Sequence, residues 1–268
     1  MPESFYAKPS LHVEIYDILT GADWTEAGGD VYFLRERFRN ITGPVLELGC
    51  GSARAAIPLT EAGFVVHGID ASSAMLSVAR AKQQRLPASV ARRLFLTQGD
   101  MRGFEFTIQF GGVYSTFRSF QNLLSPEDQE SCLCCVHRHL RTGGILVLNL
   151  FDPLYDLLLP GEHTGLVSSR VVTHPISGNK VRIEVLRRLN DPMSQCFTEA
   201  WQFTELGPDN ATVLRREEET LRMRWTFRYE MCHLLRLCGF RVLEEYSDFQ
   251  KSPPSYGKEQ VSVAVKDR

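Results

Sequence analysis

Several features are missing from the sequence, and each absence excludes a class of protein. No segment approaches the roughly 18 consecutive apolar residues of a membrane-spanning helix. The N-terminal segment carries charged side chains where a secretory signal has an apolar core. Positive charge is not in excess, since 30 lysines and arginines face 32 acidic residues, and a nucleic-acid surface needs such an excess. We therefore expect a cytoplasmic protein that binds neither membrane nor nucleic acid.

Cysteine is present in a number that argues against a disulfide-bonded scaffold. The chain has seven cysteines, an odd count without a secretory signal, which indicates reduced thiols. Cys132, Cys135 and His139 share one face of an expected helix. Apolar residues flank that face and the spacing matches no tetrahedral zinc site, so we expect no metal.

What the sequence does contain is a regular alternation of strand-like and helix-like segments. The chain has 268 residues, 43% of them hydrophobic and 23% charged, as in ordinary globular proteins. The expected strands of the first half are 45–48, 65–69, 93–98, 111–115 and 145–150. Helical patterns separate them, the first over 53–62. This rhythm predicts right-handed crossovers and a parallel, doubly wound sheet.

The rhythm changes after Asp152. Four strand-like segments joined by short turn signals predict an antiparallel meander, over 166–173, 180–189, 195–205 and 213–226. A helix and two strands would then complete the main sheet. The predicted fold class is α/β, a doubly wound mixed sheet with an inserted antiparallel β meander. The predicted parts are an N-terminal helical cap (1–44), a ligand-binding core (45–152), the insertion (153–228) and the end of the core (229–268).

The most informative segment is a glycine turn that follows the first of these strands. The turn has the spacing Glu47-x-Gly49-x-Gly51, and a helix follows it. Glycine lets a ligand lie against the backbone, and a helix N-terminus offers free N–H groups to its polar end. A dinucleotide fingerprint would need a third glycine where this chain has Arg54.

This turn resembles motif I of the class I S-adenosylmethionine-dependent methyltransferases, and the likeness covers roughly residues 45–150. The other matching pieces are 68–72, 99–101 and 140–144. The resemblance implies a Rossmann-like methyltransferase fold, with S-adenosylmethionine as cofactor and S-adenosylhomocysteine as product. The residues that it assigns to the cofactor are Tyr16, Trp24, Glu47, Gly49, Cys50, Gly51, Asp70, Ala71, Met75, Asp100, Met101, Ser115 and Thr116.

The family pattern also implies separate roles within this set. The two glycines would approach the methionine part of the cofactor, Asp70 the ribose hydroxyls, and Asp100 with Met101 the adenine. Met75 either packs on the adenine or simply fills the core. Ala53 departs from the family, which often has glycine at this position.

The inserted meander and the N-terminal segment narrow the resemblance. An insertion at this point is similar to that of small-molecule N-methyltransferases acting on amino sugars and amino acids. There it forms a lid or a homodimer surface, while N-terminal helices close over the cofactor. Tyr16 and Trp24 are similar in placement to aromatic residues that cover the sulfonium, a cation–π contact worth about 0.5–2 kcal/mol. Packing of an amphipathic helix would explain Tyr16 equally well.

The loop after the fourth strand, 115–123, is expected to hold the acceptor, because open α/β sheets bind ligands at the carboxyl ends of strands. The expected substrate residues are Phe117, Arg118, Phe120 and Asn122. Similar loops in amino-sugar N-methyltransferases often carry a histidine where this chain has Asn122, and asparagine is no base. Either His12 substitutes for it, or the acceptor needs no base. The expected catalytic residues are Tyr16, Asn122 and His12.

Together these observations predict methyl transfer to a small-molecule acceptor, in natural-product or secondary metabolism, with nitrogen slightly favoured over oxygen or carbon. Two alternatives stay open. A nicotinamide-dependent oxidoreductase or epimerase would share the sheet, but the glycine spacing and the lack of a Tyr-x-x-x-Lys pair disfavour it. A protein that binds the cofactor without transferring the methyl group is kept open by Asn122.

Overall fold

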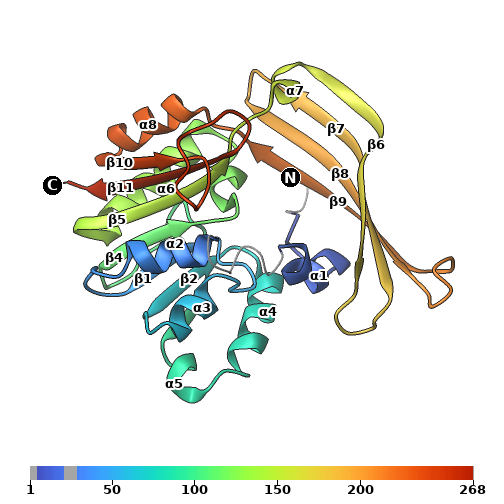
Figure 1. The fold of residues 1–268 in the computed structure, drawn as a ribbon, viewed down its shortest axis with the longest axis horizontal. Coiled ribbons are helices and arrows are strands. Elements are labelled where there is room, and N and C mark those ends of the chain that lie inside the picture. The colour runs from blue at the N-terminus through green and yellow to red at the C-terminus, as the bar shows by residue number, and fades with distance from the viewer. Residues whose placement is uncertain (1–4, 21–28, 268) are drawn as a thin grey trace.

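A seven-stranded sheet forms the centre of the molecule (Figure 1). The computed structural model describes residues 5–20 and 29–267. The strand order is β10-β11-β5-β4-β1-β2-β3, and only β11 runs against its neighbours. The strands are β1 (Val45–Leu48), β2 (Val66–Asp70), β3 (Leu94–Gln98), β4 (Phe110–Ser115), β5 (Leu140–Phe151), β10 (Phe240–Tyr246) and β11 (Glu259–Lys266). Since the strand order reverses between β1 and β4, their carboxyl ends form the switch point where such sheets bind ligands.

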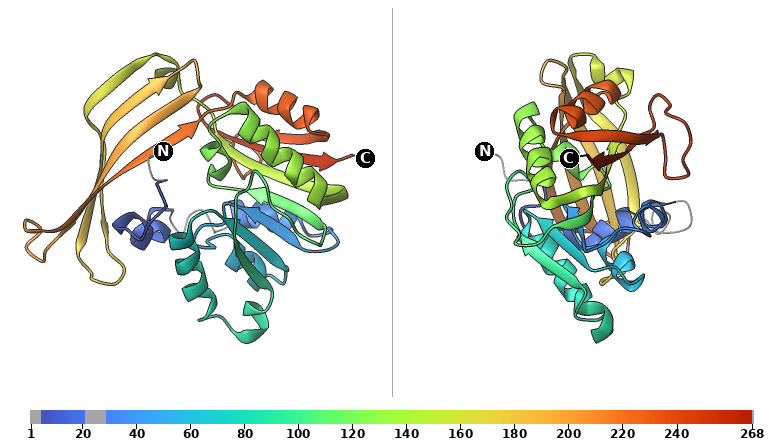
Figure 2. Two further views of the ribbon diagram at one scale, coloured as in Figure 1. Left: turned by 180° about the vertical axis from the view of Figure 1, so that it is seen from behind. Right: turned by 90° about the vertical axis from the view of Figure 1, so that its left-hand side faces the viewer.

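Helices cover both faces of this sheet (Figure 2). Side chains of α2, α3 and α4 pack on one face, and those of α6 and α8 on the other. Strand β1 is buried along its whole length, as expected of a strand covered on both faces. The helices around the main sheet are α2 (Asp30–Arg37), α3 (Ala56–Glu61), α4 (Ser73–Gln83), α5 (Ala88–Ala91), α6 (Pro126–His139) and α8 (Arg228–Leu237), with the 3₁₀ helix η2 (Ser119–Asn122). In the described ranges, no helix is both long enough and apolar enough to cross a membrane.

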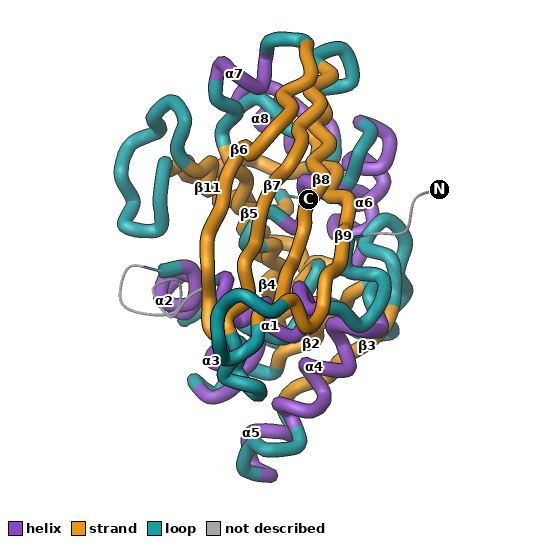
Figure 3. Tube along the Cα trace, turned by 90° about the vertical axis from the view of Figure 1, so that its right-hand side faces the viewer, coloured by secondary structure: helices purple, strands orange, loops and turns teal. Residues whose placement is uncertain are grey.

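The inserted segment forms a second sheet of four antiparallel strands in the order β6-β7-β8-β9 (Figure 3). These strands are β6 (Gly161–Thr173), β7 (Lys180–Asp191), β8 (Cys196–Leu206) and β9 (Val213–Arg224), entered through α7 (Tyr155–Leu158). The register shifts by three residues of β6 opposite one of β7, and by a single extra residue of β7 against β8, and the strands continue past both irregularities. The predicted α/β class with a mixed sheet and an antiparallel meander is confirmed, although β6 begins earlier than the expected 166.

Helix α1 (Leu11–Leu19) lies between the two sheets (Figure 1). Leu11 and Ile15 pack with Phe203 of the meander, while Val13 and the ring of Tyr16 pack against α4. The sequence indicated broken helical pieces across 6–38, and the described part of that span contains α1 and α2. The position of α1 brings Tyr16 to the switch point.

Candidate functional site

The glycine turn lies at the carboxyl end of β1. Gly49 and Gly51 have φ angles of +67° and +51°, in the left-handed region that favours glycine. A Cβ atom on Gly49 would lie 2.6 Å from the Cβ of Ser119, and one on Gly51 would lie 3.1 Å from the Cε of Met75. The turn is therefore a bare stretch of backbone enclosed by side chains.

Two other turn residues serve the packing of this segment. Ala53 has a φ of +61° without being glycine, a conformation that costs roughly 1–2 kcal/mol. Consequently α3 begins at Ala56, not at residue 53 as the pattern suggested. Cys50 is buried with its Sγ 2.8 Å from a Cβ position on Gly68, and burial raises the pKa of its thiol well above the usual value. The side chain of Cys50 therefore packs on β2 as a neutral thiol.

Asp70 ends β2 beside this turn. Its Oδ2 accepts the N–H of Gly51 at 2.7 Å and its Oδ1 accepts the N–H of Ser72 at 2.8 Å. Burial raises the pKa of Asp70, and these two backbone hydrogen bonds oppose the rise. Each oxygen has a second lone pair, so the carboxylate can also accept hydroxyl groups from a ligand.

Tyr16 and Met75 close over the turn. The Cε1 of Tyr16 lies 4.0 Å from a Cβ position on Gly51, and its ring meets that of Phe117 edge-on with centroids 6.3 Å apart. Burial raises the pKa of Tyr16 well above its usual value, so the phenol stays protonated. Met75 is buried in the same cluster. Trp24 lies outside the described residues.

Asp100 and Met101 follow β3 at the same edge of the sheet. The carboxylate of Asp100 is held by the guanidinium of Arg102, whose Nε lies 3.0 and 2.9 Å from its two oxygens, and this pairing lowers the pKa of Asp100. The Cε of Met101 lies 3.4 Å from a Cβ position on Gly49. Ala71 is exposed next to Asp70. These residues therefore border the turn on its β2–β3 side.

Glu47 supports the turn from inside the protein. Its buried carboxyl accepts a hydrogen bond of 3.1 Å from the hydroxyl of Tyr114. Burial raises the pKa of Glu47 to about 8, against the opposing influence of Arg54 and of the Tyr114 hydrogen bond. Arg54 is itself ion-paired with Asp30 on α2. Glu47 thus lies buried beneath the turn, and its assignment to the cofactor stays a prediction.

The elevated pKa of Glu47 predicts a pH-dependent stability. Because folding favours the protonated carboxyl, this residue's contribution to the free energy of unfolding is full below the ordinary value of 4.5 and is lost as the pH rises towards about 8. A Glu47→Gln variant cannot lose that proton. Urea unfolding should show the variant gaining stability relative to the natural chain between about pH 5 and about pH 8.5. The exposed Glu61→Gln should show no such gain, and a constant difference for Glu47→Gln would contradict the assignment.

The loop after β4 connects the turn with the last strand. Phe117 and Arg118 have φ angles of +52° and +67°, a strained pair of conformations of the kind found at functional sites. The N–H of Phe117 donates to the Oδ1 of Asn149 at 3.0 Å, and the Nδ2 of Asn149 donates to the Oε2 of Glu259 at 2.9 Å. Arg118 pairs with the Oε1 of Glu259 at 2.6 Å. The loop is thereby fixed to β5 and β11.

The remaining predicted loop residues are spread over three environments. Ser115 and Thr116 are buried at the end of β4. Phe120 is fully buried in the core that α6 covers, and its predicted contact with an acceptor stays a prediction. Asn122 is exposed, and its amide donates to the carbonyl of Ser119 at 3.1 Å.

His12 lies between α1 and the meander. Its ring stacks on Phe203 with centroids 5.1 Å apart, and its Nδ1 lies 3.7 Å from the Oε2 of Glu219. The ring of Tyr16, 6.1 Å away between centroids, separates it from the glycine turn. This placement favours a packing role for His12 over contact with a reacting atom.

A cleft of about 870 Å³ opens between the meander and the loops that follow β5 and β10. Its apolar wall includes Phe151, Leu157, Phe197, Trp201, Leu221 and Met223. Arg118 and Glu259 also line it, so the cleft is continuous with the loop after β4. A cavity of this size and lining suits a small-molecule ligand.

Several of these residues had no signal in the sequence. Glu259 reaches the site because β11 pairs with β5 and sets it opposite Phe151. Asp17 connects α1 to the turn, accepting hydrogen bonds from Ser52 at 2.5 Å and from Lys82 at 2.8 Å. A polar residue one position after Tyr16 was the only local hint of that contact.

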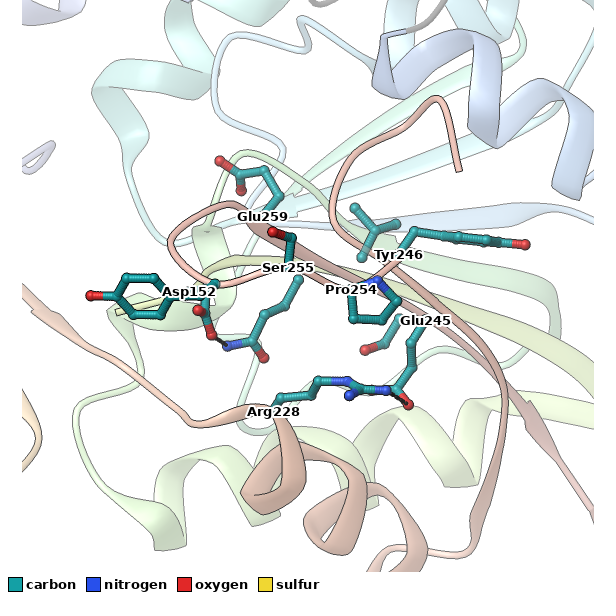
Figure 4. A pocket seen from close by; sticks show the side chains of 11 residues that line it. Asp152, Arg228, Glu245, Tyr246, Pro254, Ser255 and Glu259 are labelled. Atoms are coloured by element: carbon teal, nitrogen blue, oxygen red, sulfur yellow. Dashed lines mark hydrogen bonds and ion pairs between the residues drawn. The ribbon is translucent and has the colours of Figure 1, made fainter. Parts of the chain in front are cut away.

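A smaller pocket of about 150 Å³ lies between α8 and the β10–β11 loop (Figure 4). Its charged groups satisfy one another: Arg228 binds Glu245 at 2.9 Å, and Asp152 accepts a hydrogen bond from Gln260 at 2.9 Å. Within the described ranges, no three histidine, cysteine or acidic side chains gather as metal ligands. We therefore place the candidate functional site at the larger cleft and the turn.

The residues around the turn have the chemistry that S-adenosylmethionine requires. Side chains of Ser119, Met101 and Met75 fill the space beside Gly49 and Gly51, so contact of the turn with the methionine part stays a prediction. The carboxylate of Asp70 can accept the ribose hydroxyls. Tyr16 presents an aromatic ring where a sulfonium would gain cation–π attraction. The donors, acceptors and apolar surfaces thus fit this cofactor.

Comparison with known proteins agrees with this chemistry. Residues 45–144 match a family described as a methyltransferase domain. The putative methyltransferase YqeM of Bacillus subtilis is 35% identical over 233 residues, which cover 82% of each chain. A dTDP-3-amino-3,4,6-trideoxy-alpha-D-glucopyranose N,N-dimethyltransferase of Streptomyces venezuelae is 26% identical over 190 residues, 68% of this chain and 77% of that one.

The fold is also found in solved structures of methyltransferases. The CcbJ methyltransferase from Streptomyces caelestis matches with a TM-score of 0.73 at 21% identity, covering 98% of this chain and 100% of that one. At this identity the likeness shows the fold, and the Bacillus relative shows the family. The nicotinamide-dependent alternative is accordingly not favoured. The chain belongs to the class I S-adenosylmethionine-dependent methyltransferases.

Proposed function

We propose that the enzyme methylates a nitrogen atom of a small molecule bound in the cleft beside the glycine turn. The observation that carries this proposal is the continuity of the cleft with the Phe117–Arg118 loop, whose first ring meets Tyr16 over the turn. The sugar N,N-dimethyltransferase relative supports nitrogen as the acceptor atom and secondary metabolism as the setting.

The proposed division of labour follows from the geometry. Gly49, Gly51, Asp70 and the residues around them bind the cofactor, while Tyr16 covers its methyl-bearing end and excludes water. S-adenosylmethionine, when bound, supplies a methyl group whose C–S bond breaks as the nitrogen lone pair forms the new C–N bond. The protein's main task is then to align the acceptor. Asparagine cannot act as a base at neutral pH, so we propose that the amine reaches the site unprotonated and leaves it as the methylated ammonium ion.

Release of S-adenosylhomocysteine tests this proposal. The full chain with S-adenosylmethionine should release it when small amines are supplied, and mass spectrometry should find the methyl group on nitrogen. Matched alcohols in place of the amines serve as the control and should give no product. Tight cofactor binding without release from any amine would favour the alternative of a cofactor-binding protein; product from the alcohols alone would overturn the choice of nitrogen.

We also propose that the meander, 153–228, inserted between the core segments 45–152 and 229–268, acts as a lid or as a homodimer surface, with 1–44 as the N-terminal helical cap. The edge strand β6 supports a dimer surface because most of it is exposed, including Leu166 at 61%. A cytoplasmic location is proposed from the cysteines, all seven of which are free. Sedimentation of the purified chain tests the dimer: a monomer at micromolar concentration would contradict it.

A further inference from the structure

The cleft beside the turn has a charge pattern that restricts its ligand. Among the described residues that line it, the cationic side chains are Arg118, Arg188 and Lys258, and the acidic ones are Asp152, Glu199, Asp248 and Glu259. A diphosphate or phosphate group needs guanidinium or ammonium groups that are free to receive it. The partners of the two arginines therefore decide whether the cleft can take such a group.

Arg118 forms an ion pair with Glu259. Its Nη2 lies 2.6 Å from the Oε1 of Glu259, and its guanidinium carbon lies 5.6 Å from the ring centroid of Phe151. The carboxylate is only 15% exposed and is fixed on its other side by Asn149. An anion that approached the 44%-exposed guanidinium of Arg118 would lie beside the carboxylate of Glu259 and be repelled by it.

Arg188, on the meander side of the cleft, forms an ion pair with Glu199. Its Nε lies 2.7 Å from the Oε1 of Glu199, and its Nη1 lies 3.4 Å from Asp156. Glu199 is buried and also accepts the indole N–H of Trp201 at 2.9 Å. The third cationic side chain that lines the cleft, that of Lys258, is exposed and has Asp248 as an acidic neighbour.

The cleft therefore combines paired arginines, a surplus of carboxylate and an aromatic wall. Asp248 accepts the N–H of Ser252 at 2.9 Å and is also hydrogen-bonded by the side chain of Ser252 and the backbone of Gln250, so its carboxylate stays ionised at the rim of the cleft. Phe151, Phe197 and Trp201 supply flat apolar surface on which a ring can lie. Carboxylates accept the N–H groups of an amine and stabilise the ammonium ion that methyl transfer forms, and they repel a phosphate.

We infer that the acceptor is an amine on an apolar, ring-bearing body without a phosphate or diphosphate group, and that Glu259 orients its amino end. This inference rests on the proposed function, and it separates the chain from its relative that acts on a nucleotide-linked amino sugar. Glu259 is the carboxylate to choose because its hydrogen-bond chain through Asn149 ends at the backbone of Phe117, beside Tyr16.

Pyridoxamine and pyridoxamine 5′-phosphate test the inference, because they share an amine and an aromatic ring and differ by a phosphate. Calorimetric titration of the full chain saturated with S-adenosylhomocysteine should give pyridoxamine at least about tenfold tighter binding than its phosphate at low salt. Thymidine diphosphate should not compete with it. Binding of the phosphate as tight as that of pyridoxamine, or binding of neither, would overturn the inference.

The Glu259→Gln variant should change the affinities for the two probes in opposite directions. Removal of this charge frees Arg118, so pyridoxamine should bind about tenfold more weakly and pyridoxamine 5′-phosphate more tightly. Glu162→Gln is the matched control, since Glu162 pairs with Arg187 at 3.2 Å on the meander surface and does not line the cleft. Equal weakening of both probes in Glu259→Gln would mean a structural role alone. Cofactor binding and S-adenosylhomocysteine release are measured separately. Loss of either in the natural chain would contradict the proposed function, whereas the two probes test only the inference about the acceptor.

Discussion

Replacing Asp70 with asparagine is expected to lower the affinity for S-adenosylmethionine on the order of 100-fold. The carboxylate accepts the N–H of Gly51 with one oxygen and the N–H of Ser72 with the other. An amide has a single oxygen, so whichever way it turns, its NH₂ group faces one of these donors. The negative charge that would accept the ribose hydroxyls is lost as well. Isothermal titration measures the loss, and circular dichroism checks the fold.

A matched variant separates the cofactor effect from the general effect of losing a capping carboxylate. Asp209 also accepts two backbone N–H groups, those of Ala211 at 3.0 Å and Thr212 at 2.9 Å, but in the β8–β9 turn of the meander. Asp209→Asn should bind the cofactor as the natural chain does. If a folded Asp70→Asn protein kept full affinity, the assignment of Asp70 to the ribose would be wrong.

Substituting alanine for Gly49 is expected to cost the largest amount of stability of any single methyl group added at the site. The left-handed φ of +67° costs about 1 kcal/mol for alanine. The new Cβ would also lie 2.6 Å from the Cβ of Ser119, which must move together with η2, for roughly 1–3 kcal/mol more. Urea unfolding measures the sum, and cofactor titration should show a parallel loss of affinity.

Gly178, in the β6–β7 turn of the meander, provides the control for the backbone term. It has a φ of +74°, close to that of Gly49, and a Cβ there would meet nothing within 4 Å. Gly178→Ala should therefore show the conformational cost without the collision, and it should leave cofactor binding unchanged. Equal losses of stability in the two variants would show that the contact between Gly49 and Ser119 does not constrain the turn.

The fold around the turn could be predicted because its signals are local. A strand, a glycine turn and a helix within 45–62 follow from apolar runs and glycine spacing, and the carboxyl ends of parallel strands meet at one edge. The same locality allowed Asp70 to be selected. The start of α3 was missed because Ala53 adopts a left-handed conformation that no propensity of alanine indicates.

The acceptor side of the site depends on contacts between distant segments. Asn149 and Glu259 are 110 residues apart and meet only through the pairing of β5 with β11. No sequence pattern in either strand predicts that pairing. His12 illustrates the converse: it lies one helical turn from Tyr16 and was a reasonable candidate base, yet it stacks on Phe203 of the meander. Phe120, predicted to contact the acceptor, is fully buried in the core, because a loop residue and a core residue of the same type look alike in sequence.

Isothermal titration of the purified full chain with S-adenosylmethionine, S-adenosylhomocysteine, NAD and NADP tests the central claim most directly. The geometry of the turn, with Asp70 beside two glycines and Tyr16 above them, predicts micromolar binding of the first two ligands and none of the nicotinamides. Binding of a nicotinamide alone, or of none of the four, would contradict the account of this site.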